Sequence, residues 1–262
     1  MLKYPVLMVH GLGFRDQILV FNYWGRIAKN IEDMGERVYY GKNDAWGSIY
    51  DSAMSIKKSV DEALEINKAK KINIIAHSRG GLDCRYLIST LGYADKIASL
   101  TTISTPHKGS KSLNIMHSAP DWIISIVSLF VNTYFKILGD KKPKFGIACK
   151  ELSEISSIEF NKNNPNESNV YYQSFGSKLN SPFNDMMFFI LNILICIIDD
   201  ENDGIVSLES AKWDNFKAIT PRNESKGLSH SDVVDLRRRD RFGFDICGFY
   251  KNIIVGLAEK GF

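Results

Sequence analysis

The stretch IIAHSRGGLDCRYLI, Ile74 to Ile88, decides the fold because it passes from an apolar strand directly into a helix. Ser78 stands at the corner, and Ala76 and Gly80 are its small neighbours. A strand that turns directly into a helix forces the corner residue into a strained conformation that lifts its side chain clear of the sheet. Small neighbours let the start of the helix cross close to the strand. The stretch therefore predicts an A-x-S-x-G form of the nucleophile elbow, with a helix-capping role for Ser78 as the alternative.

Strands and helices alternate on both sides of this corner. The short β-branched runs PVLMV, RVYY, INIIA and IASLTTIS are separated by stretches of helical periodicity around Phe21–Met34, Asp51–Lys70 and Gly81–Leu91. VYYQSF and FKAIT follow as later strands, and a helix from about Phe242 to Glu259 closes the chain. This pattern predicts one α/β domain over residues 1–262, with a mostly parallel central sheet covered by helices on both faces.

The composition is that of one globular α/β chain, with 262 residues of which 44% are hydrophobic and 11% aromatic. The formal net charge is only +3, and the cations are scattered apart from RRRDR at Arg237–Arg241. We therefore expect no nucleic-acid partner. We interpret the RRRDR run as a solvated face, with contact to an anionic lipid or substrate as the alternative. The four cysteines lie far apart without a C-x-x-C pair, which predicts neither a zinc knuckle nor a disulfide framework.

The strand–helix pattern breaks after Pro106. Two apolar runs follow, Asp121 to Leu138 and Met186 to Ile198; the first contains several polar residues and the second is too short, so we expect no transmembrane span. We expect helical cap or lid and acyl-pocket insertions over about residues 107–170 and 182–200.

Two further segments carry predictions about exposure and location. The Asn-rich NKNNPNES segment, Asn161 to Ser168, predicts an exposed loop. MLKYPVLMVHG at the N-terminus leaves no room for a signal peptide ahead of the first strand. We therefore expect a cytoplasmic protein, or a secreted one if the sequence is a trimmed mature form.

A serine hydroxyl becomes a nucleophile when a base takes its proton, so Ser78 requires a histidine and a carboxylate later in the chain. The order after a nucleophile elbow is serine, acid, histidine. His107 lies just past a strand end and His117 in the expected insertion, whereas His230, in GLSHSDVVDL, follows the last strand. His230 is therefore the predicted general base, with a capping or surface role as the alternative.

The acid is expected in DDENDGIVSLESAKW. Asp203 is the predicted residue because a glycine and an apolar pair follow it, a turn that can present one carboxylate inward. We expect the three preceding carboxylates, Asp199, Asp200 and Glu201, to be solvated.

Two backbone amides are predicted to stabilise a developing oxyanion. VHGLGF follows the first strand, where its glycines let the backbone approach closely, and the amide of Leu12 would point toward Ser78. The start of the helix after Ser78 supplies the second donor, the amide of Arg79.

Five segments in order resemble bacterial true lipases of the α/β-hydrolase fold, the group that includes Pseudomonas, Burkholderia and Staphylococcus enzymes: YPVLMVHGLG, NIIAHSRGGLDCRYLIS, TTISTPHKGS, NDGIVSLESAKW and SHSDVVDL. The resemblance covers both ends of the chain and skips roughly residues 111–171 and 186–198. One departure is Arg79, which stands where many members carry Met or Gln. By position the resemblance implies the same nucleophile, acid, base and oxyanion amides, namely Ser78, Asp203, His230, Leu12 and Arg79.

The resemblance also implies a mobile lid, which would account for the two apolar runs; ordinary core helices are the alternative. The candidate substrate-binding residues are apolar and are expected around the acyl pocket: Phe14, Trp122, Met187, Phe188 and Val206.

No cofactor is expected to be required. Some members bind calcium through an Asp two positions after the catalytic histidine, a place that Asp232 matches, and Asp185 is a candidate for a second carboxylate. The thermophilic branch of these lipases has a zinc site that requires a His-containing insertion between the early strands; this sequence has no such insertion, so we expect no zinc.

The sequence thus predicts a lipase or esterase that cleaves esters of apolar acyl chains through an acyl-enzyme, with a lipid or ester, at a lipid–water interface, as its partner. A lipid-directed acyltransferase or amide deacylase using the same triad is an alternative. A non-catalytic lipid-binding protein is a third hypothesis, against which the serine, aspartate and histidine in order argue.

Overall fold

Six parallel strands form the central sheet in the order β4-β1-β5-β6-β7-β8. The computed structural model describes residues 1–262 except 19–20, 186–197, 199–200 and 224. The strands are β1 (Val6–Val9), β4 (Val38–Tyr40), β5 (Ile72–His77), β6 (Ile97–Ile103), β7 (Tyr171–Gly176) and β8 (Phe216–Ala218). The predicted mostly parallel α/β sheet is confirmed.

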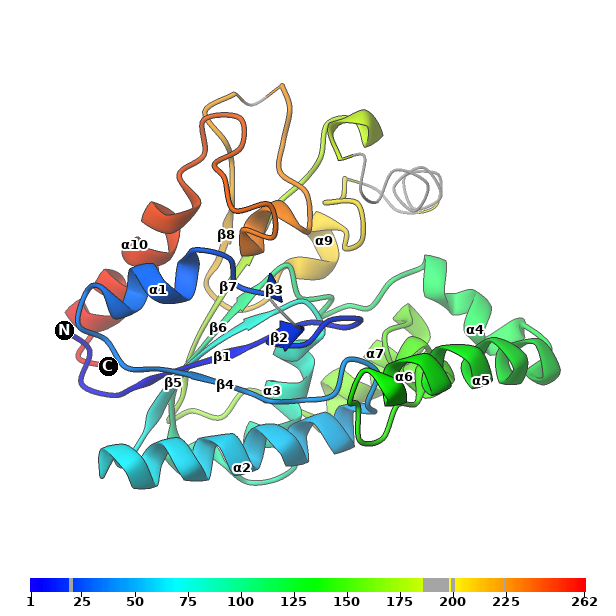
Figure 1. Ribbon diagram of the computed structural model, residues 1–262, viewed down its shortest axis with the longest axis horizontal. Coiled ribbons are helices and arrows are strands. Elements are labelled where there is room, and N and C mark those ends of the chain that lie inside the picture. The colour runs from blue at the N-terminus through cyan, green and yellow to red at the C-terminus, as the bar shows by residue number, and fades with distance from the viewer. Residues whose placement is uncertain (19–20, 186–197, 199–200, 224) are drawn as a thin grey trace.

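Helices cover both faces of this sheet (Figure 1). One face carries α2 (Ile49–Asn67) and α3 (Gly80–Ile88), and the other carries α1 (Ile27–Glu32) and α10 (Ile246–Glu259). The side chains of β1 alternate between two cores, because successive residues of a strand point to opposite faces. Val6 and Met8 pack in the core that includes α1 and α10, whereas Leu7 and Val9 pack in the core that includes α2 and α3.

A helical segment lies between β6 and β7 along the chain and gathers at one end of the molecule in Figure 1. None of the side chains of its longest helix, α5 (Asp121–Ile137), is buried. Among the described residues no single helix is long and apolar enough to cross a membrane, although the bent pair Ser112–Ser118 and Asp121–Ile137 would match by length and composition. The other elements of the segment are η2 (Ser112–Asn114), α4 (Ile115–Ser118), α6 (Phe145–Glu151) and α7 (Glu154–Asn163).

Short elements complete the chain: η1 (Ala94–Lys96), η3 (Pro182–Asn184), α9 (Leu208–Ala211) and η4 (Asp232–Val234).

The helix expected around Phe21–Met34 is shorter than predicted. A two-stranded antiparallel hairpin of β2 (Gln17–Ile18) and β3 (Phe21–Asn22) precedes it, and α1 begins only at Ile27. The side chain of Asn22 accepts the amide of Trp24 at 2.9 Å, which favours a turn over a helix. Gly25 has a φ of +50°, and a Cβ there would lie 2.2 Å from the Asp235 carbonyl, so the turn is fixed by a tertiary contact.

The Asn-rich segment is only partly the exposed loop that was expected, because α7 continues to Asn163. Asn161 donates to the carbonyl of His107 at 2.8 Å, and buried Asn164 accepts from the hydroxyl of Thr90 at 2.7 Å. These asparagines hold the end of α7 against α3 and the chain after β6. The local sequence gives no sign of this burial, because the partners of both side chains are distant in the chain.

Candidate active site

Ser78 occupies the predicted corner between β5 and α3. Its φ of +54° lies in the left-handed region, which is strained for a residue with a side chain. Its amide donates to Ile103 of β6 at 2.9 Å, and its carbonyl accepts the Thr105 hydroxyl at 2.7 Å. A Cβ on Gly80 would lie 2.6 Å from the carbonyl oxygen of His10, so α3 crosses the end of β1 as closely as the small residue permits.

His230 and Asp203 form a hydrogen-bonded pair on the loops after β7 and β8. His230 Nδ1 lies 2.8 Å from Asp203 Oδ2, and the His230 amide donates to the Asp203 carbonyl at 2.9 Å. Asp203 is almost completely buried. Its Oδ1 accepts the amides of Ile205 and Val206 at 3.1 and 2.8 Å. The turn predicted from the following glycine therefore fixes the carboxylate from one side, so that the other oxygen faces the imidazole.

Ser78 and His230 line the same cavity. Among the contacts of the described residues, none joins the Ser78 hydroxyl to the imidazole; such bonds are often long before substrate binds. The two alternative histidines lie elsewhere. His107 is fully buried, with Nε2 2.9 Å from the Thr102 hydroxyl, and the Nε2 of His117 lies 2.8 Å from the hydroxyl of Ser153.

The other carboxylates considered as the acid are placed differently or lie outside the described residues. Glu201 is exposed and pairs with Lys178 at 2.5 Å. Asp199 and Asp200 lie outside the described residues.

The amides of Leu12 and Arg79 are available beside Ser78. Neither donates to another group in the backbone hydrogen bonds of the described residues. A Cβ on Gly11 would lie 2.6 Å from the Cβ of Ser78, so only glycine lets the chain after β1 pass this close. The Arg79 side chain takes no part in this surface, because it is buried toward α2 with its Nη2 2.9 Å from Ser52 Oγ and 3.1 Å from Asp83 Oδ1.

Sequence reasoning did not identify His77 and Tyr23 as site residues. The rings of His77 and His230 lie 4.4 Å apart between centroids. The Tyr23 hydroxyl accepts the Gly11 amide at 3.3 Å and lies 2.6 Å from His77 Nδ1, to which it can donate its proton. Burial, together with the nearby His230, lowers the pKa of His77 well below its ordinary value, so this ring is neutral. The position of His77 immediately before Ser78 could have indicated that His77 belongs to the site, whereas no feature of the sequence around Tyr23 points to the site.

The cavity over Ser78 has a volume of about 340 Å³ and a predominantly apolar wall. Of the predicted substrate-binding residues, Phe14 and Val206 line it. Trp122 does not line it; its side chain lies on α5 and is 66% exposed. Met187 and Phe188 lie outside the described residues. Further apolar lining comes from Leu12, Trp46, Leu113, Leu152 and Val234.

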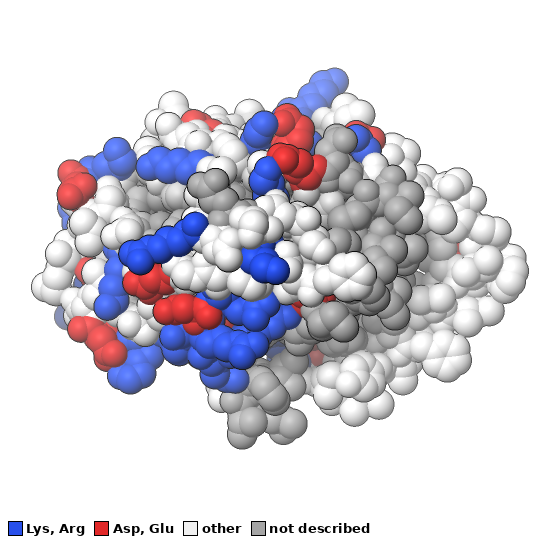
Figure 2. Space-filling model, turned by 90° about the horizontal axis from the view of Figure 1, so that it is seen from above, with Lys and Arg blue, Asp and Glu red and all other residues white. Residues whose placement is uncertain are grey.

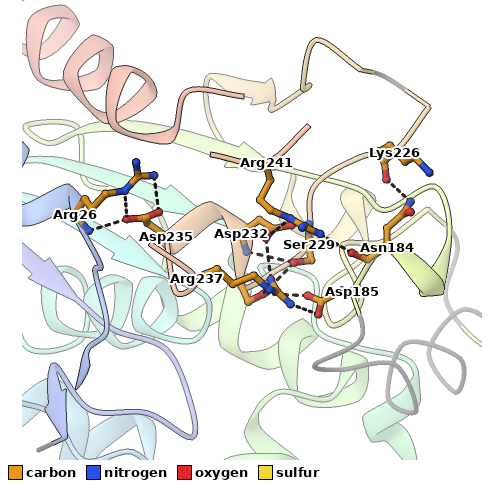
Figure 3. Close-up of polar contacts among 10 residues, drawn as sticks. Arg26, Asn184, Asp185, Lys226, Ser229, Asp232, Asp235, Arg237 and Arg241 are labelled. Carbon is orange, nitrogen blue, oxygen red and sulfur yellow. Dashed lines mark hydrogen bonds and ion pairs between the residues drawn. The ribbon is translucent and has the colours of Figure 1, made fainter. Parts of the chain in front are cut away.

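The two carboxylates considered for calcium converge on an arginine instead (Figure 3). Arg237 Nη1 donates to Asp232 Oδ1 at 2.8 Å, and its Nη2 donates to Asp185 Oδ1. The guanidinium thus fills the space in which a cation would bridge Asp185 and Asp232, so the residues do not fit a bound calcium ion. In the described part of the chain, no group of three or more His, Cys, Asp or Glu side chains could hold a metal ion.

The same contacts correct the interpretation of the RRRDR run as a solvated face. Arg238 and Arg239 are exposed, but Arg237 and Arg241 are half-buried and ion-paired with Asp232. The sequence pattern could not distinguish the buried arginines from the exposed ones, because burial depends on ion-pair partners outside the run. Asp232 lies on the preceding turn, and the second partner of Arg237, Asp185, lies on the chain after β7.

Comparison with known proteins supports a hydrolase. A sequence model of the palmitoyl protein thioesterase family matches residues 5–250. Triacylglycerol lipase 2 of Saccharomyces cerevisiae is 31% identical over 268 residues, which cover 94% of this chain and 76% of the relative. The triacylglycerol lipase of Burkholderia plantarii is 28% identical over 62% of this chain and 48% of its own length, so the chain spans about half of that bacterial relative.

A solved structure agrees with the fold. Staphylococcus hyicus lipase matches with a TM-score of 0.73 at 18% identity, over 98% of this chain and 96% of that chain. The chain therefore belongs to the palmitoyl protein thioesterase family and, with its triacylglycerol lipase relatives, is a carboxylic ester hydrolase of the α/β-hydrolase superfamily.

Proposed function

We propose that Ser78, His230 and Asp203 act as a catalytic triad that cleaves carboxylic esters of apolar acyl chains. The observation that carries the proposal is the 2.8 Å contact between His230 Nδ1 and buried Asp203, together with the cavity that both His230 and the strained Ser78 corner line. A carboxylate that accepts from Nδ1 holds the imidazole in the tautomer whose Nε2 can take a proton.

The chemistry follows from these positions. Ser78 Oγ attacks the ester carbonyl while His230 Nε2 takes the hydroxyl proton, and the carbonyl oxygen becomes an oxyanion that the Leu12 and Arg79 amides stabilise. Collapse of this intermediate breaks the bond to the alcohol, which leaves with the proton from His230. A water then attacks the acyl-enzyme by the same route and releases the carboxylic acid, with Ser78 restored. Asp203 stabilises the imidazolium without taking the proton.

An apolar acyl chain suits the wall of the cavity. Leu12, Phe14, Trp46 and Leu152 surround the space beside Ser78, and burial of an aliphatic chain there gains about 0.8 kcal/mol per methylene. This gain predicts that kcat/KM rises with acyl length until the cavity is full.

We also propose that the exposed face of α5 contacts a lipid–water interface. Phe130 and Ile137 are 71% and 79% exposed, and Trp122, Leu129 and Tyr134 are more than half exposed. On the face drawn in Figure 2, the described residues at the end that bears α4 and α5 include few charged side chains. An apolar patch of this kind is typical of a surface that meets protein or lipid. The neighbouring α6 reaches the cavity through Cys149.

The test is a series of p-nitrophenyl esters of increasing acyl length, assayed below and above the concentration at which they form micelles. We expect Ser78→Ala and His230→Ala to lose activity by about 10⁴-fold or more, because triad members act as a unit. A fluorophosphonate probe should label Ser78 alone. Activity that survives in Ser78→Ala would overturn the mechanism.

Contact of α5 with the lipid–water interface is tested with a double variant and a matched control. Phe130→Ser combined with Ile137→Ser should reduce the gain in activity on passing to micelles by about tenfold or more, because each buried apolar side chain contributes about 1.5–3 kcal/mol. Ile66→Ser removes a similarly exposed isoleucine from the end of α2 and should leave that gain unchanged. Equal responses of the two proteins would refute a role for α5.

A thioester is the second candidate substrate, favoured by the match to the palmitoyl protein thioesterase family. The same triad could cleave it, since the attacked carbonyl carbon is common to both. Palmitoyl thioester and palmitoyl ester should be compared by kcat/KM, and a preference for the thioester would make it the principal substrate class.

A further inference from the structure

A buried ion-pair cluster holds the loop that carries His230. We call Asp185, Ser231, Asp232 and Arg237 the Arg237 cluster. Arg237 Nη1 donates to Ser231 Oγ at 2.6 Å and to Asp232 Oδ1 at 2.8 Å, and its Nη2 reaches Asp185. The two carboxylate side chains are completely or almost completely buried, whereas Arg237 is 19% exposed. One guanidinium therefore bridges two carboxylates that come from separate parts of the chain (Figure 3).

The cluster is continuous with the backbone on both sides of His230. Ser231 donates to Asp185 Oδ2 at 3.0 Å, and Asp232 Oδ2 accepts the Ser229 amide at 3.2 Å. Ser229 Oγ in turn accepts the Asp232 amide at 3.2 Å. The residues before and after His230 are thereby tied to the segment that ends at Asp185. This arrangement limits how far the imidazole can shift relative to Ser78.

The two carboxylates of the Arg237 cluster are balanced by two arginines, Arg237 and the adjacent Arg241. Burial alone raises the pKa of Asp185, but hydrogen bonds from Ser229 and Arg237 bring this pKa below its ordinary value, so the carboxylate is ionised. Arg241 Nε lies 3.5 Å from Asp232 Oδ1, and Arg241 Nη2 donates to the carbonyl of Asn184 at 2.9 Å. A calcium ion takes six to eight oxygen ligands and would have to displace the guanidinium from between the carboxylates.

We propose that Arg237 is a positioning residue that serves as a fixed cation for the His230 loop, in the space that a bridging calcium ion would otherwise fill. The inference rests on the proposed catalytic role of His230. Its consequences are that ester hydrolysis needs no divalent cation, and that removal of the guanidinium leaves two buried carboxylates able to bind one.

The experiment compares wild type, Arg237→Ala and Arg239→Ala, each with EDTA and with calcium chloride. Arg239 is an exposed arginine in the same run, so it controls for the loss of a positive charge. We expect wild type and Arg239→Ala to keep their activity and melting temperature in EDTA and to show no change with calcium. Arg237→Ala should lose about 10- to 100-fold in kcat, the usual effect of losing a group that orients a site ligand, with KM nearly unchanged. Calcium should raise its melting temperature and restore part of its kcat.

Two outcomes would overturn the proposal. One is a wild-type enzyme that loses activity in EDTA and recovers it with calcium. The other is an Arg237→Ala variant that keeps the wild-type kcat or whose melting temperature does not respond to calcium. Should Arg237→Ala fail to fold without calcium, Arg237→Gln, which keeps one donor, is compared in the same way. The melting temperature of Arg237→Ala does not depend on catalysis, so its response to calcium tests the proposal separately from the catalytic assignment of His230.

Discussion

Replacement of Asp203 by asparagine tests the orientation of His230 directly. Asp203 Oδ1 accepts two backbone amides, from Ile205 and Val206, while Oδ2 faces His230 Nδ1 at 2.8 Å. An asparagine at this position has one oxygen and one NH₂ group. The two amides require the oxygen on their side, so the NH₂ group must face the imidazole. His230 Nδ1 then has to accept a hydrogen bond, which moves its proton to Nε2 and removes the base that Ser78 needs.

The structure also gives the strength of this preference. The opposite orientation of the asparagine side chain would leave both buried amides without an acceptor, at about 1–3 kcal/mol each, or about 2–6 kcal/mol in total. Even the lower figure leaves only about 1 molecule in 30 with the oxygen toward His230. Loss of the correct tautomer lowers kcat by about 10⁴-fold in other serine triads, which corresponds to about 5.5 kcal/mol of transition-state stabilisation.

The assay is kcat and KM on a short soluble p-nitrophenyl ester, with the melting temperature measured in parallel. We expect Asp203→Asn to lose about 10⁴-fold in kcat with a KM close to that of wild type. Glu201→Gln is the control, because this carboxylate lies two residues away on the surface and pairs only with a lysine among the ion pairs of the described residues. It should change kcat by less than about twofold. If Asp203→Asn kept a tenth of the wild-type kcat in a folded protein, the assignment of Asp203 would be wrong.

Two further changes test the packing around Ser78. Tyr23→Phe removes the hydroxyl that lies 2.6 Å from buried His77, so it should lower the free energy of unfolding in urea by about 1–3 kcal/mol, and an unchanged midpoint would contradict this hydrogen bond. Gly80→Ala places a Cβ 2.6 Å from a backbone carbonyl and should lower the free energy of unfolding by about 1–3 kcal/mol. Gly256→Ala in α10 meets nothing within 4 Å and should raise it by about 0.5–1 kcal/mol. Equal melting temperatures for the two variants would refute the close crossing of α3 over the end of β1.

Local patterns were sufficient to predict the sheet and its corner. The strands β5 and β6 are fully buried because both faces of the sheet are covered, and this burial is visible in the sequence as runs that are mostly apolar. The Ser78 corner is equally local, since strand, serine and small residues follow one another in the chain. The pairing of Asp203 with His230 could also be predicted from chain order, because Asp203 precedes a glycine turn and His230 follows the last strand.

Other features were misjudged because their cause is not local. The early helix was overestimated at its N-terminal end, where Gly25 is held in a turn by close contact with Asp235, more than two hundred residues away. Asn161 and Asn164 were expected in a solvent-exposed loop, but the end of α7 packs them against α3 and the chain after β6. In each case the local composition favoured one conformation, and a contact from a remote segment selected another.

By itself, the sequence determined the α/β class, the strained Ser78 corner and the order in which acid and base follow it, because each depends on hydrophobic periodicity or on neighbouring residues. Only the tertiary structure decided what fills the space between Asp185 and Asp232. In the sequence, these two carboxylates could bind a metal ion, or they could pair with any of several arginines in the RRRDR run. The three-dimensional path of the chain after η4 brings the guanidinium of Arg237 between them, and its planar, fixed positive charge satisfies both carboxylates at once.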